Sequence, residues 1–239
     1  DSVTSIGDLA FYYCKALTDV TIGTGVTSIG ERAFVYCPAL TNFNVRSGNS
    51  VYTSVDGVLF TKDRSTLVKY PIGKTAESYQ VTGGVKHIGI CAFEGCTSLV
   101  DVTMPNGVTS LGVWAFNGCS SLESVTIPSS VTDIESGAFD GCTALSDVYY
   151  SGTFDDWVFI DVDYNNKPLL TAAIHYESLP GNPFVDVAEG RYFYDPVQWA
   201  VSQGITAGTS ATTFSPADTC TRAQVVTFLW RAAGCPEPE

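Results

Sequence analysis

Basic residues and histidine are scarce in this sequence of 239 residues. Lysine and arginine together number 12 against 25 aspartates and glutamates, and the net charge at pH 7 is −13. A charge of this sign and size repels the phosphates of nucleic acids and anionic membrane surfaces, so we expect neither as a partner. Since His87 and His175 are the two histidines, the chain also has little capacity for acid–base chemistry near neutral pH.

Long apolar runs are absent as well. No run approaches the roughly 20 residues that a membrane-spanning helix requires, so we expect no membrane span. The segment after Asp1 lacks the charged-then-apolar pattern of a secretion signal, and we expect either a removed leader or a start within a longer protein. Apolar residues still make up 45% of the chain, which predicts folded domains rather than disorder.

An internal repeat organises the first two thirds of the sequence. Five copies of Ala-Phe-x-x-Cys occur, each followed by a leucine three residues after the cysteine. The copies are spaced by 23 residues within the first pair and within the last three, and their cysteines are Cys14, Cys37, Cys96, Cys119 and Cys142. A fixed period of this length predicts a solenoid, because one coil cannot bury its apolar face without stacked neighbours.

Each copy also contains two short alternations of apolar residues around a turn. In the last copy these residues are Leu122, Val125, Ile127, Val131 and Ile134, on either side of residues 128–130. Such alternation predicts two short strands, and the Ala-Phe-x-x-Cys stretch predicts a helical turn that folds the chain back. The expected fold is a mainly β solenoid whose repeated Leu, Val, Ile, Phe and Cys side chains form the core.

The repeat pattern, clearest at 122–142, resembles the BspA-like (Treponema pallidum-type) leucine-rich repeats of bacterial surface proteins. The resemblance covers roughly residues 1–150. It implies a leucine-rich-repeat solenoid in an extracellular setting, with roles in adhesion or in binding a protein or glycan on host or neighbouring cells. It supplies no catalytic residues, and the identity of the ligand stays open.

We expect the solenoid to span residues 1–176, with an irregular insertion at about 44–81 and a cap at about 149–176 that covers its C-terminal end. The insertion contains Asp56-Gly57 between apolar residues, which predicts a hairpin turn. Leu67, Tyr70 and Pro71 imitate the first half of a degenerate coil. A hairpin rung within the solenoid is the favoured interpretation, and a dedicated binding loop is the alternative.

The C-terminal part of the sequence follows a different pattern. A turn-rich break at 180–183 ends the repeat and predicts a linker over 177–183. Asp195-Pro196 is typical of a helix start, and Thr221 with Gln224 matches a capping box at the start of a second helix. Residues 184–239 are therefore expected to form a small α-helical module.

This module resembles the S-layer homology family through Phe184-Val185-Asp186-Val187, Trp199-Ala200, Phe214-Ser215-Pro216 and Thr221-Arg222-Ala223-Gln224. The family pattern usually has glutamate where Gln224 stands, which leaves a charged role for that position in doubt. The resemblance implies attachment to a secondary cell-wall polysaccharide, usually through three such modules, of which one is present. We assign polymer binding to Arg222, Gly208, Thr221 and Trp199, although a core position is the favoured interpretation of Trp199.

No cofactor or metal is expected. Asp161, Asp163 and Asn165 imitate the start of a calcium loop, but Asn166 and Ala172 stand where that loop needs glycine and glutamate. The repeat cysteines recur at equivalent positions of stacked coils, where parallel side chains have poor disulfide geometry, so we expect buried free thiols. The redox state of the other three, Cys91, Cys220 and Cys235, stays open.

The sequence thus favours a non-enzymatic protein of the cell wall or S-layer, located outside the cell. Tyr12, Tyr13 and Tyr36 occupy variable positions around the repeat cysteines and are the candidate ligand surface. Two alternatives remain, namely the non-catalytic part of a larger wall-anchored enzyme and a structural spacer. The oligomeric state and the number of wall-binding modules in the full-length protein also remain open.

Overall fold

The computed structural model describes residues 2–176, apart from the side chains of Phe154 and Asp155. The chain divides into two compact units, residues 1–151 with 156–174 and residues 152–155 with 175–239. The predicted linker and wall-binding module, with Arg222, Gly208, Thr221 and Trp199, lie outside the described residues. The α-helical form of that module therefore stays a prediction.

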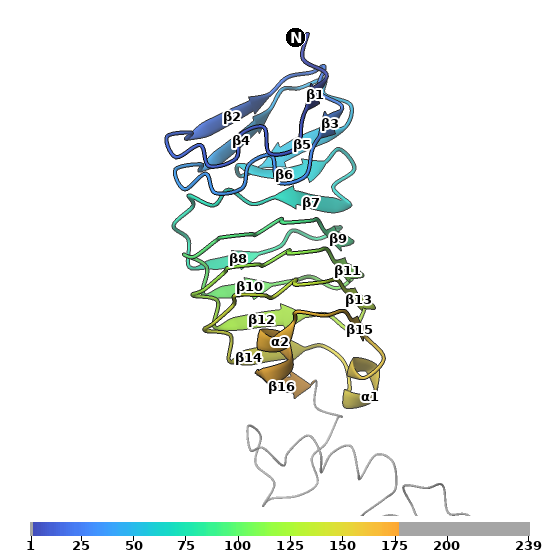
Figure 1. Ribbon diagram of the computed structural model, residues 1–239. Coiled ribbons are helices and arrows are strands. Elements are labelled where there is room, and N and C mark those ends of the chain that lie inside the picture. The colour runs from blue at the N-terminus through green and yellow to red at the C-terminus, as the bar shows by residue number, and fades with distance from the viewer. Residues whose placement is uncertain (1, 177–239) are drawn as a thin grey trace, which may run out of the picture. The chain divides into compact units, whose positions relative to one another are not determined.

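The first unit is a mainly β solenoid, as the repeat predicts (Figure 1). Its coils contribute short strands to two columns, and each column is split into two sheets. One column contains β2 (Asp19–Ile22) with β4 (Asn42–Val45), and then β8 (Ser78–Gln80), β10 (Asp101–Thr103), β12 (Ser124–Ile127), β14 (Asp147–Tyr150) and β16 (Ala173–Tyr176). The other contains β1 (Ser5–Ile6) with β3 (Ser28–Ile29), and then β5 (Tyr52–Val55), β6 (Val58–Thr61), β7 (Thr66–Lys69), β9 (His87–Ile88), β11 (Ser110–Leu111), β13 (Asp133–Ile134) and β15 (Asp161–Val162).

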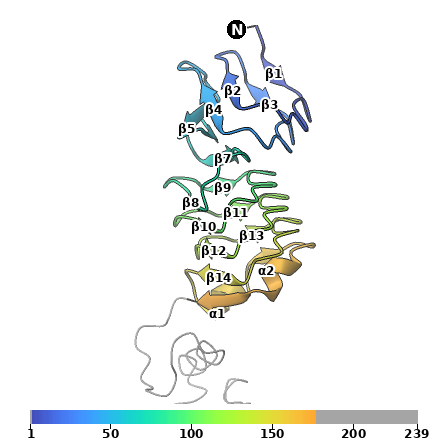
Figure 2. The same cartoon turned by 90° about the vertical axis from the view of Figure 1, so that its left-hand side faces the viewer.

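Neighbouring repeat strands pair in parallel with a register that equals the repeat length. Ser5 lies opposite Ser28, and Asp101 lies opposite Ser124, so the partner stands one full repeat further along in each pair. Every side chain therefore stacks on its equivalent in the next coil, which explains why the apolar positions are repeated so closely. Figure 2 shows the successive coils stacked one on the next.

The five Ala-Phe-x-x-Cys segments form tight turns rather than regular helices, and we name them by their cysteines, from the Cys14 turn to the Cys142 turn. Their phenylalanines are fully buried in the last three turns. Phe116 stacks on Phe93 and Phe139 with ring centroids 4.8 and 5.1 Å apart. The two helices present in the described part of the chain are short, α1 (Phe154–Trp157) and α2 (Lys167–Thr171).

The repeat cysteines are free thiols, and four of the five are buried. Cys37, Cys119 and Cys142 each donate an S–H bond to a phenylalanine carbonyl of the preceding turn, at Sγ···O distances of 3.0–3.1 Å. The prediction of full burial is wrong for Cys14, which is half-buried because no turn packs against its outer side in the described structure. Cys91 is also free and buried.

An insertion interrupts the stack between the Cys37 and Cys96 turns. Strands β5, β6 and β7 pair in antiparallel order, and β7 then pairs in parallel with β9. This register places Leu67 opposite Ile88 in the second strand of a coil, so our assignment of Leu67 to the first half of a coil is wrong. The segment that follows β7 has no Ala-Phe-x-x-Cys turn. Tyr70 instead stacks on Phe93 at 5.2 Å and takes the place of the missing repeat aromatic.

The C-terminal end of the stack is closed by residues that follow the Cys142 turn. The buried side chain of Asn166 accepts a hydrogen bond from the amide of Phe139 and donates to the carbonyls of Glu135 and Asp163. Asn166 thus satisfies backbone groups that another coil would otherwise satisfy.

Candidate functional site

The three tyrosines that the sequence singles out lie together on the surface of the first two turns. The ring of Tyr12 packs edge-on against Tyr36 with centroids 5.6 Å apart and lies 6.3 Å from the ring of Tyr13. Their exposed fractions are 46%, 57% and 40% for Tyr12, Tyr13 and Tyr36. The repeat register brings Tyr13 and Tyr36 to equivalent positions of stacked turns, which is why residues distant in sequence share one surface.

Two of these tyrosines adopt a backbone conformation that disfavours large side chains. Tyr13 has φ of 61° and Tyr36 has φ of 56°. The last three turns have glycine at the same position, namely Gly95, Gly118 and Gly141. A left-handed conformation costs a residue with a Cβ roughly 1 to 2 kcal/mol. Such strain concentrates at functional sites, and here it accompanies exposed rings rather than buried ones.

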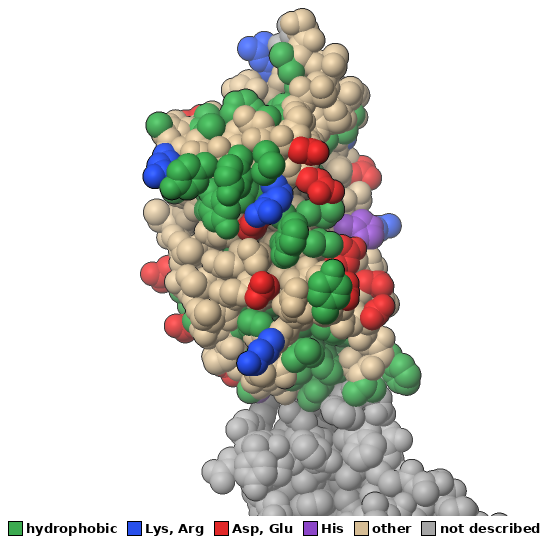
Figure 3. Space-filling view, viewed as in Figure 1, with side chains coloured by type: hydrophobic (Ala, Val, Ile, Leu, Met, Phe, Trp, Pro, Cys, Tyr) green, Lys and Arg blue, Asp and Glu red, His purple; other side chains and the backbone are tan. Residues whose placement is uncertain are grey.

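Other groups extend this tyrosine cluster. The Lys15 ammonium lies 4.5 Å from the centre of the Tyr13 ring, and Phe11 stacks on Phe34 at 5.2 Å while remaining 37% exposed. Figure 3 shows hydrophobic side chains gathered over the N-terminal coils on the face that carries the turns. A contiguous exposed apolar patch is typical of an interaction surface. Tyrosine suits such a surface because its ring offers a large contact area with few rotatable bonds.

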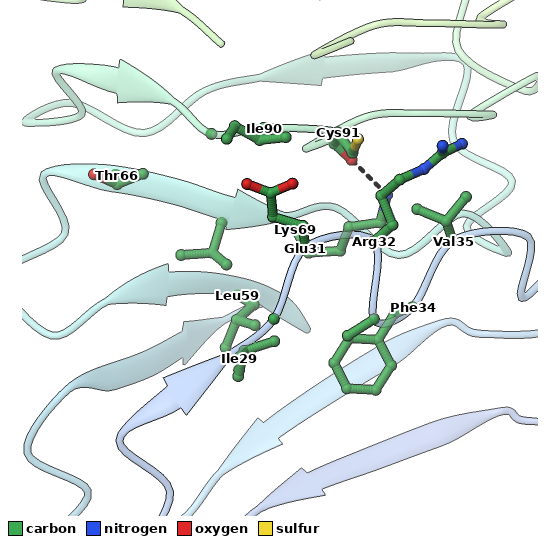
Figure 4. Close-up of a pocket in the computed structure, with 14 residues that line it drawn as sticks. Ile29, Glu31, Arg32, Phe34, Val35, Leu59, Thr66, Lys69, Ile90 and Cys91 are labelled. Atoms are coloured by element: carbon green, nitrogen blue, oxygen red, sulfur yellow. Dashed lines mark hydrogen bonds between the residues drawn. The ribbon is translucent and has the colours of Figure 1, made fainter. Parts of the chain in front are cut away.

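A pocket of about 240 Å³ opens at the interruption of the stack (Figure 4). Its walls come from the segment 29–35, from Leu59 of β6, from β7 and from residues 89–91. Lys69 in this pocket is 6% exposed and donates from Nζ to the carbonyl oxygen of Cys91 at 2.6 Å. A buried ammonium is costly unless its N–H groups have acceptors, so this position is a candidate for ligand contact.

An ion pair crosses the same interruption. Arg32 Nη2 lies 2.7 Å from Oε1 of Glu94, and the guanidinium also lies 5.0 Å from the ring centre of Trp114. Arg32, Glu94 and Lys69 are not among the residues that the sequence pattern predicts for a site. Arg32 was the available signal, because the equivalent residues of the other turns, Leu9, Cys91, Trp114 and Gly137, carry no formal charge.

The described residues offer little for catalysis. His87 is exposed in β9, with Nδ1 2.8 Å from Ser110 Oγ. Burial raises the pKa of Cys91 to about 12, which leaves its thiol protonated and unreactive at neutral pH. Within residues 2–176 no three His, Cys, Asp or Glu side chains gather in a metal-binding group. In the same range no helix has the length and apolar character needed to cross a bilayer.

Several bacterial proteins of known structure resemble this chain. A leucine-rich repeat protein from Eubacterium ventriosum is 30% identical with a TM-score of 0.59, over 63% of this chain and 40% of that one. A leucine rich cell surface protein from Faecalibacterium prausnitzii is 31% identical with a TM-score of 0.46, over 68% and 55%. The pneumococcal vaccine antigen PcpA, 20% identical with a TM-score of 0.56 over 74% and 49%, shares the fold. The chain thus spans about half or less of these proteins, and no curated protein matches it.

Two family models match the sequence. Residues 183–226 match the S-layer homology domain, and a domain of this kind implies association with the cell surface or S-layer. Residues 1–66 and 73–161 match six copies of the BspA type leucine rich repeat region. With its solenoid of stacked, repeated coils, the chain belongs to the BspA type leucine rich repeat family.

Proposed function

We propose that the chain is a non-enzymatic cell-surface binding protein whose solenoid recognises a protein or glycan ligand through Tyr12, Tyr13 and Tyr36. The observation that carries this proposal is the left-handed backbone of Tyr13 and Tyr36, at a position where three other turns have glycine. Strain without a packing benefit is expected to persist where the side chain serves binding. Exposed tyrosines also account for a large share of binding energy in protein interfaces.

The S-layer homology match supports the second half of the proposal, which is attachment to a secondary cell-wall polymer. We assign polymer contacts to Arg222, Thr221, Gly208 and Trp199, with Arg222 first because a guanidinium grips anionic substituents through paired donors. Since the wall-binding grooves of this family form between modules, one module is expected to hold the polymer weakly. The protein would act outside the cell, at the wall or S-layer.

An array of glycans and host matrix proteins, probed with the whole chain, tests the ligand surface. The variant in which Tyr12, Tyr13 and Tyr36 are all serine should lose at least tenfold in affinity for any ligand found. Tyr164→Ser is the matched control, because Tyr164 is 68% exposed but lies in the C-terminal part of the solenoid. Equal binding by the triple variant and the parent would reject the tyrosine surface.

Wall attachment is tested separately by pull-down onto purified wall polymer. Arg222→Ala should weaken retention, most clearly when three modules are joined in tandem. Retention that is unchanged in the three-module form would remove Arg222 from the binding site. If neither assay finds a partner for the whole chain, a structural spacer or the non-catalytic part of a larger surface enzyme becomes the better description.

A further inference from the structure

Consecutive turns of the solenoid are joined by a repeated set of backbone hydrogen bonds. In each complete pair, three amides of one turn donate to carbonyls of the next turn, at N···O distances of 2.7–3.1 Å. The donors and acceptors are Leu9 to Glu31, Phe11 to Ala33, Tyr13 to Val35, Cys91 to Val113, Phe93 to Ala115, Gly95 to Asn117, Trp114 to Ser136, Phe116 to Ala138 and Gly118 to Asp140. The acceptors are always carbonyls of alternate residues of a polypeptide.

The Cys37 turn has the same three donors without acceptors. The amides of Arg32, Phe34 and Tyr36 stand at the repeat positions, and none of them donates a hydrogen bond to any described residue. Phe34 is itself buried. Arg32 is half-buried and Tyr36 is 40% exposed, so water reaches that end of the turn more easily. Buried backbone amides in folded proteins are almost always paired, so the unpaired amide of Phe34, with one more on each side, calls for an occupant.

The last turn shows that the chain can satisfy such donors itself. Gly137 donates to the carbonyl of Tyr164, and Phe139 donates to the side chain of Asn166. No comparable group within residues 2–176 reaches the Cys37 turn, because the insertion leads the chain away from it. The amide of Tyr70 donates to the carbonyl of Ala92 in the Cys96 turn. The next hydrogen bond, from the amide of Gly73, is accepted by the carbonyl of Leu40, which follows the three unpaired amides in the sequence.

The pocket of about 240 Å³ lies beside these donors and contains further unsatisfied groups. Apart from its bond to Cys91, the Lys69 ammonium has no other acceptor among the described residues. On the opposite side, the carbonyls of Ile90 and Glu94 accept no hydrogen bond from the described chain. The unmet groups are thus mainly donors, and they match an occupant that presents carbonyl oxygens at alternate residues.

We propose that the interruption is a docking slot for a peptide segment of a partner protein, which enters as a replacement turn and displaces the Arg32 side chain from the ion pair that crosses the interruption. Its alternate carbonyls accept from the three unpaired amides of the Cys37 turn, and a carbonyl or acidic side chain meets Lys69. Hydrogen bonds between the peptide backbone and the unpaired amides supply affinity. The apolar pocket wall at Ile29, Leu59 and Val68 selects one apolar side chain of the peptide. The slot goes beyond the tyrosine surface and does not depend on its rings.

The probe is a displayed library of linear nine-residue peptides, selected on the whole chain. Amide hydrogen exchange followed by NMR then reports on each donor. The amides of Arg32, Phe34 and Tyr36 should exchange quickly in the free chain and become protected with a selected peptide. Those of Ala33 and Val35, which already donate within the turn, should change little. Protection of the three amides in the free chain would overturn the proposal, because another part of the chain would then fill the slot.

Two matched variants test the location. Ile90→Trp places a large ring in the pocket wall at a residue that is 44% exposed, and should weaken the peptide at least tenfold. Val113→Trp makes the same change at the equivalent position of the next turn, where the backbone bonds are complete, and should leave affinity unchanged. Failure to select any peptide, or equal effects of both variants, rejects the slot. Peptide binding that survives the triple tyrosine variant separates this result from the proposed ligand surface.

Discussion

Arg32 and Glu94 form an ion pair with an N···O distance of 2.7 Å, although 62 residues separate them. The carboxylate is almost fully buried at 1% side-chain exposure, whereas the guanidinium is 32% exposed. The second oxygen of Glu94 and Nε of Arg32 have no hydrogen-bond partner in the described structure. This pair is a direct side-chain connection between turns on opposite sides of the insertion.

Replacing Arg32 by alanine should destabilise the solenoid by about 1–3 kcal/mol, because it leaves the Glu94 carboxylate buried and unpaired. The expected loss is below that for a fully buried pair, since solvent screens the exposed guanidinium. Urea denaturation of the whole chain measures it. Arg32→Ala combined with Glu94→Gln should recover part of the loss, and an unchanged midpoint for Arg32→Ala alone would show that the pair is not important for stability.

Replacing Phe116 by alanine should cost about 3–5 kcal/mol, because the ring is fully buried between two stacked neighbours that cannot close the cavity. Phe11→Ala is the matched control at the same repeat position. Phe11 is 37% exposed and stacks on one side only, so its loss should be smaller. A cost below about 1 kcal/mol for Phe116→Ala would contradict the stacked core.

Thiol titration of the denatured, unreduced chain should find most cysteines free, and a count near zero would contradict the ladder of buried thiols. Among the cysteines of residues 2–176, alkylation of the native chain should reach Cys14 first, because it is half-buried whereas the others are buried. Burial raises the pKa of Cys91 to about 12, and the thiolate is the form that is alkylated, so the reaction of Cys91 should still accelerate about tenfold per pH unit between about pH 8 and about pH 10. A rate that levels off over that range, as for an ordinary thiol, would show that burial does not raise the pKa of Cys91.

Exchanging Tyr13 for glycine should leave thermal stability unchanged or raise it, while ligand binding falls. The reason is that glycine adopts φ of 61° without steric cost, whereas the exposed ring contributes little packing. Tyr13→Ala also removes the ring but retains Cβ, and should be less stable than Tyr13→Gly by about 1 kcal/mol. If both variants melt at the same temperature, backbone strain at this position is negligible.

The solenoid was predictable because the repeat spacing in the sequence equals the register in which neighbouring strands pair. Each coil repeats the same apolar positions at a fixed spacing, and the parallel pairs of Ser5 with Ser28 and Asp101 with Ser124 follow directly. The exposed position of Tyr12 and Tyr36 also followed, since these residues occupy variable positions of a turn pattern that recurs within this chain. Their role in binding stays a prediction.

The insertion was not predictable in the same way. Leu67 was assigned to the wrong half of a coil, because the apolar pattern around it fits either strand. The contact of Arg32 with Glu94 depends on how many residues the shortened coil lacks, which the spacing alone does not reveal. The unpaired amides of the Cys37 turn could not be predicted for the same reason. They become apparent only when the structure shows that Tyr70 pairs with Ala92 and not with the Cys37 turn.

The identical bonds between complete turns also bear on how the gene can change. Because Phe116 donates to Ala138 just as Phe93 donates to Ala115, a coil can be duplicated or lost as a whole and leave matching surfaces behind. Recombination between repeats can therefore alter the length of the solenoid without requiring new contacts between coils. The interruption is the exception, because Arg32 on one side of it forms an ion pair with Glu94 on the other. We therefore expect the segment from Arg32 to Glu94 to be kept or lost as a single unit.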